Sequence, residues 1–158
     1  MRSKSRRDGR WLWRLAGFLG VLTMFLAAVA AAAGPSPYVL IKNARNKSIA
    51  TISKADARDI FTGKRKLWST GEVVQIVLRP GEGDGIEWLA QDVFGVSPRN
   101  LLTKIRQEVF KGEMAKPIVA ASDEETIKQV VSVGGAIGII PAPLAAKLPA
   151  EAVVLPIN

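Results

Sequence analysis

The sequence contains no cysteine and no histidine, and only one of its 158 residues is a tyrosine. Without cysteine the chain forms no disulfides, and without both residue types the usual zinc, haem and thiol chemistries are absent. The lack of histidine also removes the commonest general base and the Ser-His-Asp arrangement. The sequence therefore predicts a domain that is stabilised by its own hydrophobic core, with no metal and no cofactor.

Four carboxylates remain as candidates for acid–base chemistry, but their positions indicate structural roles. Asp56 and Asp59 fall in the first turn and on the exposed side of an expected helix, and Asp84 and Glu87 lie at the start of another. No nucleophile–base pair and no set of metal ligands stands out. We predict that the protein is not an enzyme.

The N-terminus has the pattern of a secretion signal. Residues 1–10 are rich in arginine and lysine, residues 11–29 are apolar apart from Arg14, and residues 30–34 are four alanines followed by glycine. A basic region, an apolar region and an Ala-x-Ala site in this order are typical of a signal peptide. We predict a signal peptide over residues 1–33, cleavage near Ala33, and a periplasmic or otherwise exported domain over residues 34–158.

Two alternatives stay open at this end of the chain. The apolar run is close to the length of a membrane-spanning helix, so it would also serve as an uncleaved membrane anchor. Ser5-Arg6-Arg7 partly matches the twin-arginine export signal, although Gly9 and Arg10 replace the apolar pair expected after it. The sequence does not distinguish the general export route from the twin-arginine route.

The positive charge of the chain is concentrated in this N-terminal segment. Of 22 Lys and Arg residues and 14 Asp and Glu residues, 6 and 1 lie within residues 1–33. This leaves 16 and 13 in residues 34–158, a net charge near +3. The sequence therefore predicts no nucleic-acid partner, because the high overall charge belongs to the predicted signal.

The rest of the chain alternates between short apolar runs and amphipathic segments. The apolar runs predict strands, and the amphipathic segments predict helices that begin at serine caps and stop near glycines. Strands are expected over residues 38–41, 73–78, 117–120, 136–140 and 153–155, and helices over 53–62, 86–94, 98–111 and 122–133, with a short helical turn reaching residue 147. This alternation predicts an α/β fold with the strands buried between helix layers.

The sequence also predicts whether three features of this fold are buried or exposed. Trp68, between a helix end and a strand, is expected to fill the core. The basic run over residues 64–66 is expected to be a solvated surface. The apolar residues of the helix over 98–111 are expected to face the core, and they are Leu101, Leu102, Ile105, Val109 and Phe110.

The most informative stretch runs from a buried strand through a glycine-rich turn into a helix. The strand over residues 73–78 is followed by Arg79, by Gly81, Gly83 and Gly85, and then by apolar residues at helical spacing. Such a turn lets backbone N–H groups converge, and the helix start adds a partial positive charge. Arg79 would add a forked cation at the same point. The stretch therefore predicts an anion site.

The same residues also support a purely structural interpretation. Asp84 and Glu87 match a capping box, which would make the stretch a strand, a turn and a helix with no ligand. Glu82 and Asp84 would repel an anion unless one of them accepts a proton from it. The stretch matches neither the Gly-x-x-x-x-Gly-Lys-Ser/Thr phosphate loop nor the glycine spacing of a dinucleotide turn. Both interpretations stay open.

The order of several motifs resembles the phosphate-binding proteins of ABC transporters. In that family an Ile-Phe-x-Gly-Lys segment, a tryptophan and a glycine precede an Arg-Ser-Asp-x-Ser-Gly-Thr ligand loop, and a Gly-Ala-Ile-Gly-Tyr strand follows. The corresponding features here are Ile60 to Lys64, Trp68, Gly71, Arg79 with the glycine loop, Phe94, and Gly134 to Gly138. The resemblance extends over residues 38–158.

The resemblance implies a type II periplasmic-binding-protein-like α/β fold, a sheet covered by helices, with phosphate held in a cleft between two lobes. It places Arg79 at the family arginine and Gly81, Gly83, Asp84 and Gly85 in the loop around the anion. It also implies an exported solute-binding domain for phosphate or a related oxyanion, with an ABC-type membrane transporter as its partner.

The chain departs from the family in three respects. The loop lacks the serine and threonine hydroxyl donors, and Ile139 replaces the tyrosine of the last motif. The chain is also about half the family's usual length, so its fold would be truncated relative to the two-lobed form. These departures support an alternative of another class, a periplasmic interaction or scaffold module that keeps the fold, binds no ligand and pairs with an envelope protein.

Overall fold

The structure is a computed structural model that describes residues 36–81 and 83–158. The predicted signal peptide over residues 1–33 lies outside the described residues, as does Glu82 of the glycine loop. Among the helices of the described ranges, none combines the length and the apolar character that crossing a membrane requires.

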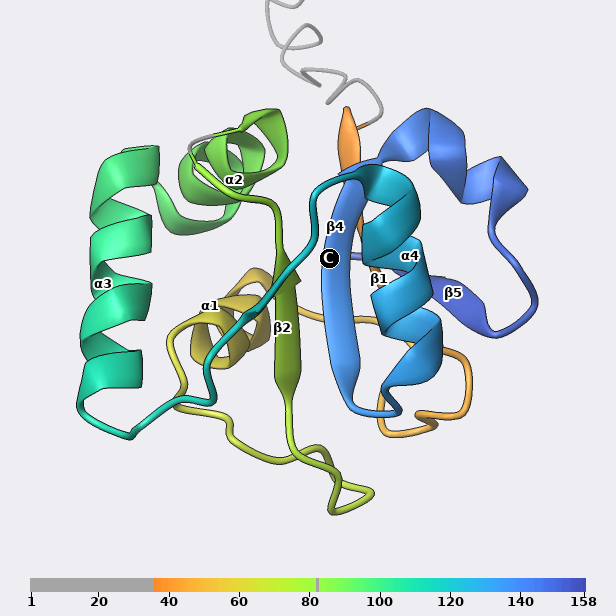
Figure 1. The fold of residues 1–158 in the computed structure, drawn as a ribbon, viewed down its shortest axis with the longest axis horizontal. Helices are drawn as coiled ribbons and strands as arrows, with labels where there is room; N and C mark the ends of the chain where they lie inside the picture. Colours follow the sequence, from red (N-terminus) through yellow and green to blue (C-terminus); the bar gives the residue numbers. More distant parts are fainter. Residues whose placement is uncertain (1–35, 82) are drawn as a thin grey trace, which may run out of the picture. The chain divides into compact units, whose positions relative to one another are not determined.

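The described residues form a five-stranded mixed sheet (Figure 1). Its strands are β1 (Tyr38–Asn43), β2 (Gln75–Leu78), β3 (Ile118–Val119), β4 (Ala136–Pro141) and β5 (Ala152–Leu155). Their order across the sheet is β3-β2-β4-β1-β5. β2 runs parallel to β3 and β4, whereas β1 runs antiparallel to both β4 and β5. The carboxyl ends of β2, β3 and β4 therefore meet the amino end of β1 at one end of the sheet.

The helices begin close to the predicted serine caps. In α1 (Lys54–Phe61), α3 (Pro98–Phe110) and α4 (Asp123–Ser132), the hydroxyl of the preceding serine accepts a hydrogen bond from a backbone N–H of the first turn. α2 (Asp84–Trp88) continues into a π-helical segment, η1 (Leu89–Phe94), and a 3-10 turn, η2 (Ala142–Lys147), follows β4. These bounds confirm the expected order of strands and helices.

Helices cover both sides of the sheet, as the fully apolar strand β4 predicts. Leu40 and Ile76 belong to a cluster shared with α1, η1 and α3, whereas Ile41 and Val77 belong to a cluster shared with α4. Neighbouring strand residues enter different clusters because successive side chains point to opposite sides of a sheet. Residues 36–158 form one contact unit that contains all five strands and both clusters, so this part of the chain has what it needs to fold by itself.

The tryptophan and a glycine of the sequence motifs meet where β2 and β4 begin. Trp68 is 3 % exposed, and its indole N–H donates a 2.9 Å hydrogen bond to the carbonyl oxygen of Gly135. The same carbonyl oxygen accepts a 2.9 Å hydrogen bond from the backbone N–H of Gln75. A β-carbon on Gly135 would lie 2.0 Å from the carbonyl oxygen of Val73, so only glycine fits at this position. The expected core position of Trp68 is confirmed.

The prediction that Phe110 faces the core is wrong, because its side chain is 93 % exposed. Leu101 and Ile105 are buried in the cluster with α1, and Val109 packs against that cluster. Consecutive residues of an α-helix are rotated by about 100°. A helix that turns Val109 toward the core therefore turns Phe110 toward solvent.

The basic run over residues 64–66 lies at the surface in ion pairs, as expected for a solvated segment. Each of its three cations contacts a carboxylate, and the pairs are Lys64–Asp59 at 3.7 Å, Arg65–Asp56 and Lys66–Glu113. Exposed pairs of this kind contribute little to stability. Asp56 and Asp59 thus serve as ion-pair partners of the basic run.

Candidate functional site

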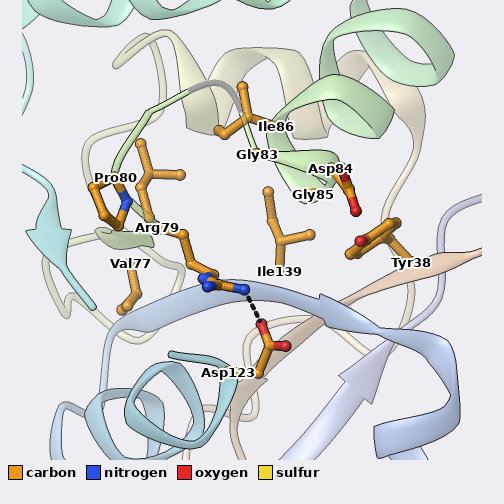
Figure 2. Close-up of a pocket in the computed structure, with 11 residues that line it drawn as sticks. Tyr38, Val77, Arg79, Pro80, Gly83, Asp84, Gly85, Ile86, Asp123 and Ile139 are labelled. Atoms are coloured by element: carbon orange, nitrogen blue, oxygen red, sulfur yellow. Dashed lines mark hydrogen bonds and ion pairs between the residues drawn. The ribbon is translucent and has the colours of Figure 1, made fainter. Parts of the chain in front are cut away.

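A pocket of about 270 Å³ opens where β2 stops and α2 begins. Its wall combines the first residue of β1, the residues at the end of β2, the turn into α2, the first residue of α4 and the middle of β4 (Figure 2). The pocket therefore lies at the end of the sheet where the carboxyl ends of the parallel strands meet. Ligand sites of open α/β sheets usually lie at such an end.

The structure brings four of the five predicted site residues together in this pocket. Arg79, Gly83, Asp84 and Gly85 all line it. Gly81 is not among its lining residues; it has a φ of +80°, which glycine adopts without strain, and so shapes the turn. The predicted loop is therefore assembled as one structure around a cavity.

The start of α2 differs from the predicted capping box. Gly83 is the N-cap residue, with φ −68° and ψ 164°, and no side-chain hydrogen bond caps the helix. Asp84 is the first helical residue, and the Glu87 carboxylate accepts a 2.9 Å hydrogen bond from Gln91 Nε2 further along the helix. The cap lies one residue earlier than predicted, because Gly83 takes the extended conformation that a cap requires. No side-chain acceptor therefore caps the first-turn N–H groups of this helix in the described residues, although the Ile86 N–H donates a 2.9 Å hydrogen bond to the carbonyl oxygen of Gly83.

Gly85 allows α2 to lie close to the sheet. A β-carbon at this position would come within 3.2 Å of Ile139 Cγ2 and 3.6 Å of Tyr38 Cδ1. Both of these residues also line the pocket. The glycine therefore sets the distance between the start of the helix and the pocket floor.

Arg79 already has a carboxylate partner in the pocket. Its Nη1 lies 3.4 Å from Oδ1 of Asp123, and its Nη2 donates a 3.4 Å hydrogen bond to the carbonyl oxygen of Ala121 (Figure 2). The Arg79 side chain is 51 % exposed and that of Asp123 is 21 % exposed. Arg79 is therefore accessible to a ligand, but a ligand anion has to share it with Asp123.

Sequence reasoning did not identify Asp123 as a pocket residue. It reaches the pocket because β3 lies beside β2, where the backbone N–H of Ala120 donates a 2.9 Å hydrogen bond to the carbonyl oxygen of Leu78. α4 then begins next to the end of β2. β2 with α2 and β3 with α4 are two strand–turn–helix units whose strands are parallel, so both helices begin at the same end of the sheet. The repetition of this pattern in the sequence could have indicated that Asp123 lies near Arg79.

Tyr38, the only tyrosine of the chain, is the second pocket residue that sequence reasoning missed. It is half-buried at the start of β1, its ring centroid lies 6.2 Å from that of Trp88, and the Asp84 carboxylate lies beside it (Figure 2). Burial, together with the charges of Asp84 and Asp123, raises the pKa of the Tyr38 phenol above its ordinary value, while Arg79 acts in the opposite direction. The phenol is therefore held in its neutral form as a hydrogen-bonding group.

The raised pKa of Tyr38 gives a direct test of the pocket geometry. In an alkaline titration followed at 295 nm, the single tyrosine is expected to ionise above pH 10, its ordinary pKa. Asp84→Asn should lower that pKa, because it removes a negative charge that disfavours the phenolate. Glu87→Gln, one turn further along the helix and exposed, is the matched control and should leave the titration unchanged. Equal shifts in both variants would contradict the proximity of Asp84 to the phenol.

The charges of the pocket are mixed. Its described lining holds one cation, Arg79, and two carboxylates, Asp84 and Asp123. Within the described ranges, no three His, Cys, Asp or Glu side chains are grouped so that they would hold a metal ion. The donors that a ligand could use are the Arg79 guanidinium, the Tyr38 hydroxyl and the backbone N–H groups of Asp84 and Gly85, and the acceptors are the two carboxylates. This set suits a small polar ligand that both accepts and donates hydrogen bonds.

Comparison with solved structures identifies the fold. A possible phosphate binding protein from Planctomyces limnophilus superimposes with a TM-score of 0.58 at 14% identity, over 77% of this chain and 41% of the other. PstS from Borrelia burgdorferi gives a TM-score of 0.55 at 19% identity, over 77% and 47%. The fold is periplasmic-binding-protein-like.

The comparison also defines the extent of the likeness. An ABC-type phosphate transport receptor from Vibrio cholerae matches with a TM-score of 0.54 at 13% identity, over 77% of this chain and 46% of the receptor. The chain thus spans less than half the length of these three solved structures, so the likeness covers only part of their fold. No protein-family model and no curated protein sequence matches this chain.

Proposed function

We propose that residues 34–158 form an exported solute-binding domain that holds phosphate or a related oxyanion at Arg79 and the turn of Gly81, Gly83, Asp84 and Gly85. The observation that carries the proposal is the convergence of Arg79 and the uncapped start of α2 on one pocket, in a fold shared with phosphate-binding proteins. The partner in this proposal is a membrane transporter of the ABC type. The predicted signal peptide supplies the export, and its retention as an anchor would keep the domain at the membrane.

In this proposal the anion takes the place of Asp123 on one edge of the Arg79 guanidinium. The first-turn N–H groups of α2 donate to a second oxygen, where the helix start adds a partial positive charge. A protonated oxyanion donates a hydrogen bond to a carboxylate of the pocket, Asp84 or Asp123. This hydrogen bond offsets the repulsion between the two negative groups. Phosphate carries such a proton at neutral pH, and sulfate does not.

Affinity is expected to be low. The loop lacks the serine and threonine hydroxyls that the resemblance leads one to expect, and Arg79 is shared with Asp123. A hydrogen bond to a charged group contributes about 1.5–3 kcal/mol, so the loss of two or three such bonds moves a site from micromolar toward millimolar affinity.

The test is a calorimetric titration of residues 34–158 with phosphate, sulfate and a set of organic phosphates. Saturable binding of phosphate with a dissociation constant in the millimolar range, and weaker binding of sulfate, is the expected result. The absence of heat and of any thermal shift with every anion would contradict the proposed ligand class.

Asp123→Asn is expected to tighten phosphate binding about tenfold, because it frees the Arg79 guanidinium and removes one negative charge from the pocket. Glu151→Gln, an exposed change of the same charge on the segment before β5, should leave the affinity unchanged. Weaker binding in Asp123→Asn would instead identify Asp123 as the acceptor of the ligand's proton.

A second candidate function is a periplasmic interaction module that keeps the fold and binds no small ligand. The observation that favours it is the ion pair in the pocket, because Asp123 already neutralises the charge of Arg79 that an anion would need. In this case the domain pairs with an envelope protein, and cross-linking in envelope membranes should capture that protein at stoichiometric levels. A monomeric domain that cross-links to no envelope protein would contradict it.

A further inference from the structure

α3 presents two different surfaces. Leu101 and Ile105 are buried against the core, and Leu102 and Val109 pack at its margin. The remaining side of the helix faces solvent at the outside of the domain (Figure 1). We call this side the α3 outer surface, and its exposed residues are Arg99, Asn100, Thr103, Lys104, Arg106, Gln107, Phe110 and the C-cap residue Lys111.

Phe110 is the most unusual member of the α3 outer surface. Its side chain is 93 % exposed, the largest exposure of any large hydrophobic residue in the described part of the chain. It borders a shallow hollow together with Arg106, Gln107 and Lys111. An exposed aromatic ring between two cations is an arrangement typical of side chains that enter the interface of a bilayer.

The α3 outer surface also concentrates positive charge. α3 with its C-cap has four cations, Arg99, Lys104, Arg106 and Lys111, and one carboxylate, Glu108, which pairs with Lys111 at 3.0 Å. The first three of these cations make no ion pair within the described residues. The net charge of this helix is therefore +3, as large as that of residues 34–158 together.

From this charge and the exposed ring, we propose that the α3 outer surface docks the domain on an anionic lipid bilayer. Phosphate headgroups neutralise the four cations, and Phe110 inserts among the acyl chains just below them. The long arginine and lysine stems lie along the apolar boundary while their charged ends stay at the headgroups. The apolar segment over residues 11–29 is predicted to be a signal peptide or an anchor, and either role would bring the chain to a membrane.

Flotation with lipid vesicles tests this docking. Residues 34–158, which contain every described strand and both core clusters, are mixed with phosphatidylcholine vesicles that contain either about one third phosphatidylglycerol or none. Binding is expected only with phosphatidylglycerol and should be lost in about 0.5 M NaCl, where charge interactions are screened within about 4 Å. Equal binding to both kinds of vesicle, or to neither, overturns the proposal.

Charge-reversal variants on α3 and on α4 test whether vesicle binding depends on the α3 outer surface or only on the total charge of the domain. Arg106→Glu should weaken vesicle binding about 25-fold, since each charge at an anionic membrane surface contributes about fivefold. Lys128→Glu, an exposed reversal on α4, is the matched control and should change binding less than twofold. Equal losses in the two variants would overturn the assignment to α3.

Removal of the ring tests the apolar part of the contact. Phe110→Ser should weaken vesicle binding about fivefold and leave the melting temperature unchanged, because the side chain makes no core contact. If Phe110→Ser binds vesicles as well as the wild type does, and the domain binds soluble polyglutamate equally tightly, then the surface recognises an acidic protein and the lipid proposal is wrong.

Discussion

Arg79→Ala is expected to weaken phosphate binding by ten- to a hundredfold, which places it beyond detection if the wild-type affinity is millimolar. Arg79 is the only cation lining the described part of the pocket, and charge-assisted hydrogen bonds of this kind contribute about 1.5–3 kcal/mol. The side chain is 51 % exposed, so its loss should not affect folding. Calorimetry on the variant and the wild type, at equal ionic strength, gives the comparison.

Two further variants sharpen that result. Arg79→Lys keeps the charge but loses the planar fork, so partial binding is expected if charge dominates and none if the forked contact dominates. Arg45→Ala, an exposed arginine in the turn after β1, controls for the loss of one positive charge and should bind phosphate as the wild type does. Unchanged phosphate affinity in Arg79→Ala would show that phosphate does not bind at Arg79 and would contradict the proposed site.

Gly135→Ala is expected to destabilise the domain by about 3 kcal/mol or more and to lower its melting temperature by about 10 °C. The new β-carbon would lie 2.0 Å from the carbonyl oxygen of Val73, and a backbone atom cannot move aside as a flexible side chain can. Relief of the clash requires β2 and β4 to separate, which breaks the hydrogen bond from the Gln75 N–H to the Gly135 carbonyl. Thermal and urea unfolding, followed by circular dichroism, measure the loss.

Gly83→Ala is the matched control for that experiment. Gly83 has a negative φ, and a β-carbon there would meet nothing within 4 Å. Its loss as an N-cap residue should cost less than about 1 kcal/mol. A small effect in both variants would show that the start of β4 can relax, contrary to the packing described above.

The sequence predicts the element order because local signals agree with the final structure. Ser53, Ser97 and Ser122 cap the helices where their positions indicate, and the apolar run of β4 lies in the middle of the sheet. Trp68 is buried as expected for a large aromatic residue between two elements. These features depend on neighbouring residues along the chain, so they can be derived without knowledge of the topology.

The sequence predicts only some of the residues that line the pocket. Arg79, Gly83, Asp84 and Gly85 lie within seven consecutive residues of the sequence, and the strand–turn–helix pattern finds them. Asp123 and Tyr38 come from α4 and β1, so identifying them requires the strand order β3-β2-β4-β1-β5, which no local pattern contains. The missed residues change the chemistry, since Asp123 pairs with the arginine and Tyr38 supplies a neutral hydroxyl.

Phe110 illustrates a different limit of sequence reasoning. Its apolar character favours burial, and its position next to Val109 is compatible with the edge of an apolar stripe. One residue step rotates a side chain by about 100°, so the last residue of such a stripe can fall on either side of the boundary. The structure assigns Val109 to the core and leaves Phe110 in solvent.

The position of β1 between β4 and β5 has a consequence for how the chain folds. Tyr38 of β1 pairs with Pro141 of β4, about 100 positions later, and Leu40 pairs with Leu155 of β5. Contacts at such separations form slowly, because a long loop has to close before they are gained. The first strand of the domain therefore has both of its neighbours in the last part of the chain. Until residues 136–155 have joined the sheet, β1 has neither of its neighbours, so the domain cannot close its sheet before the last part of the chain is present.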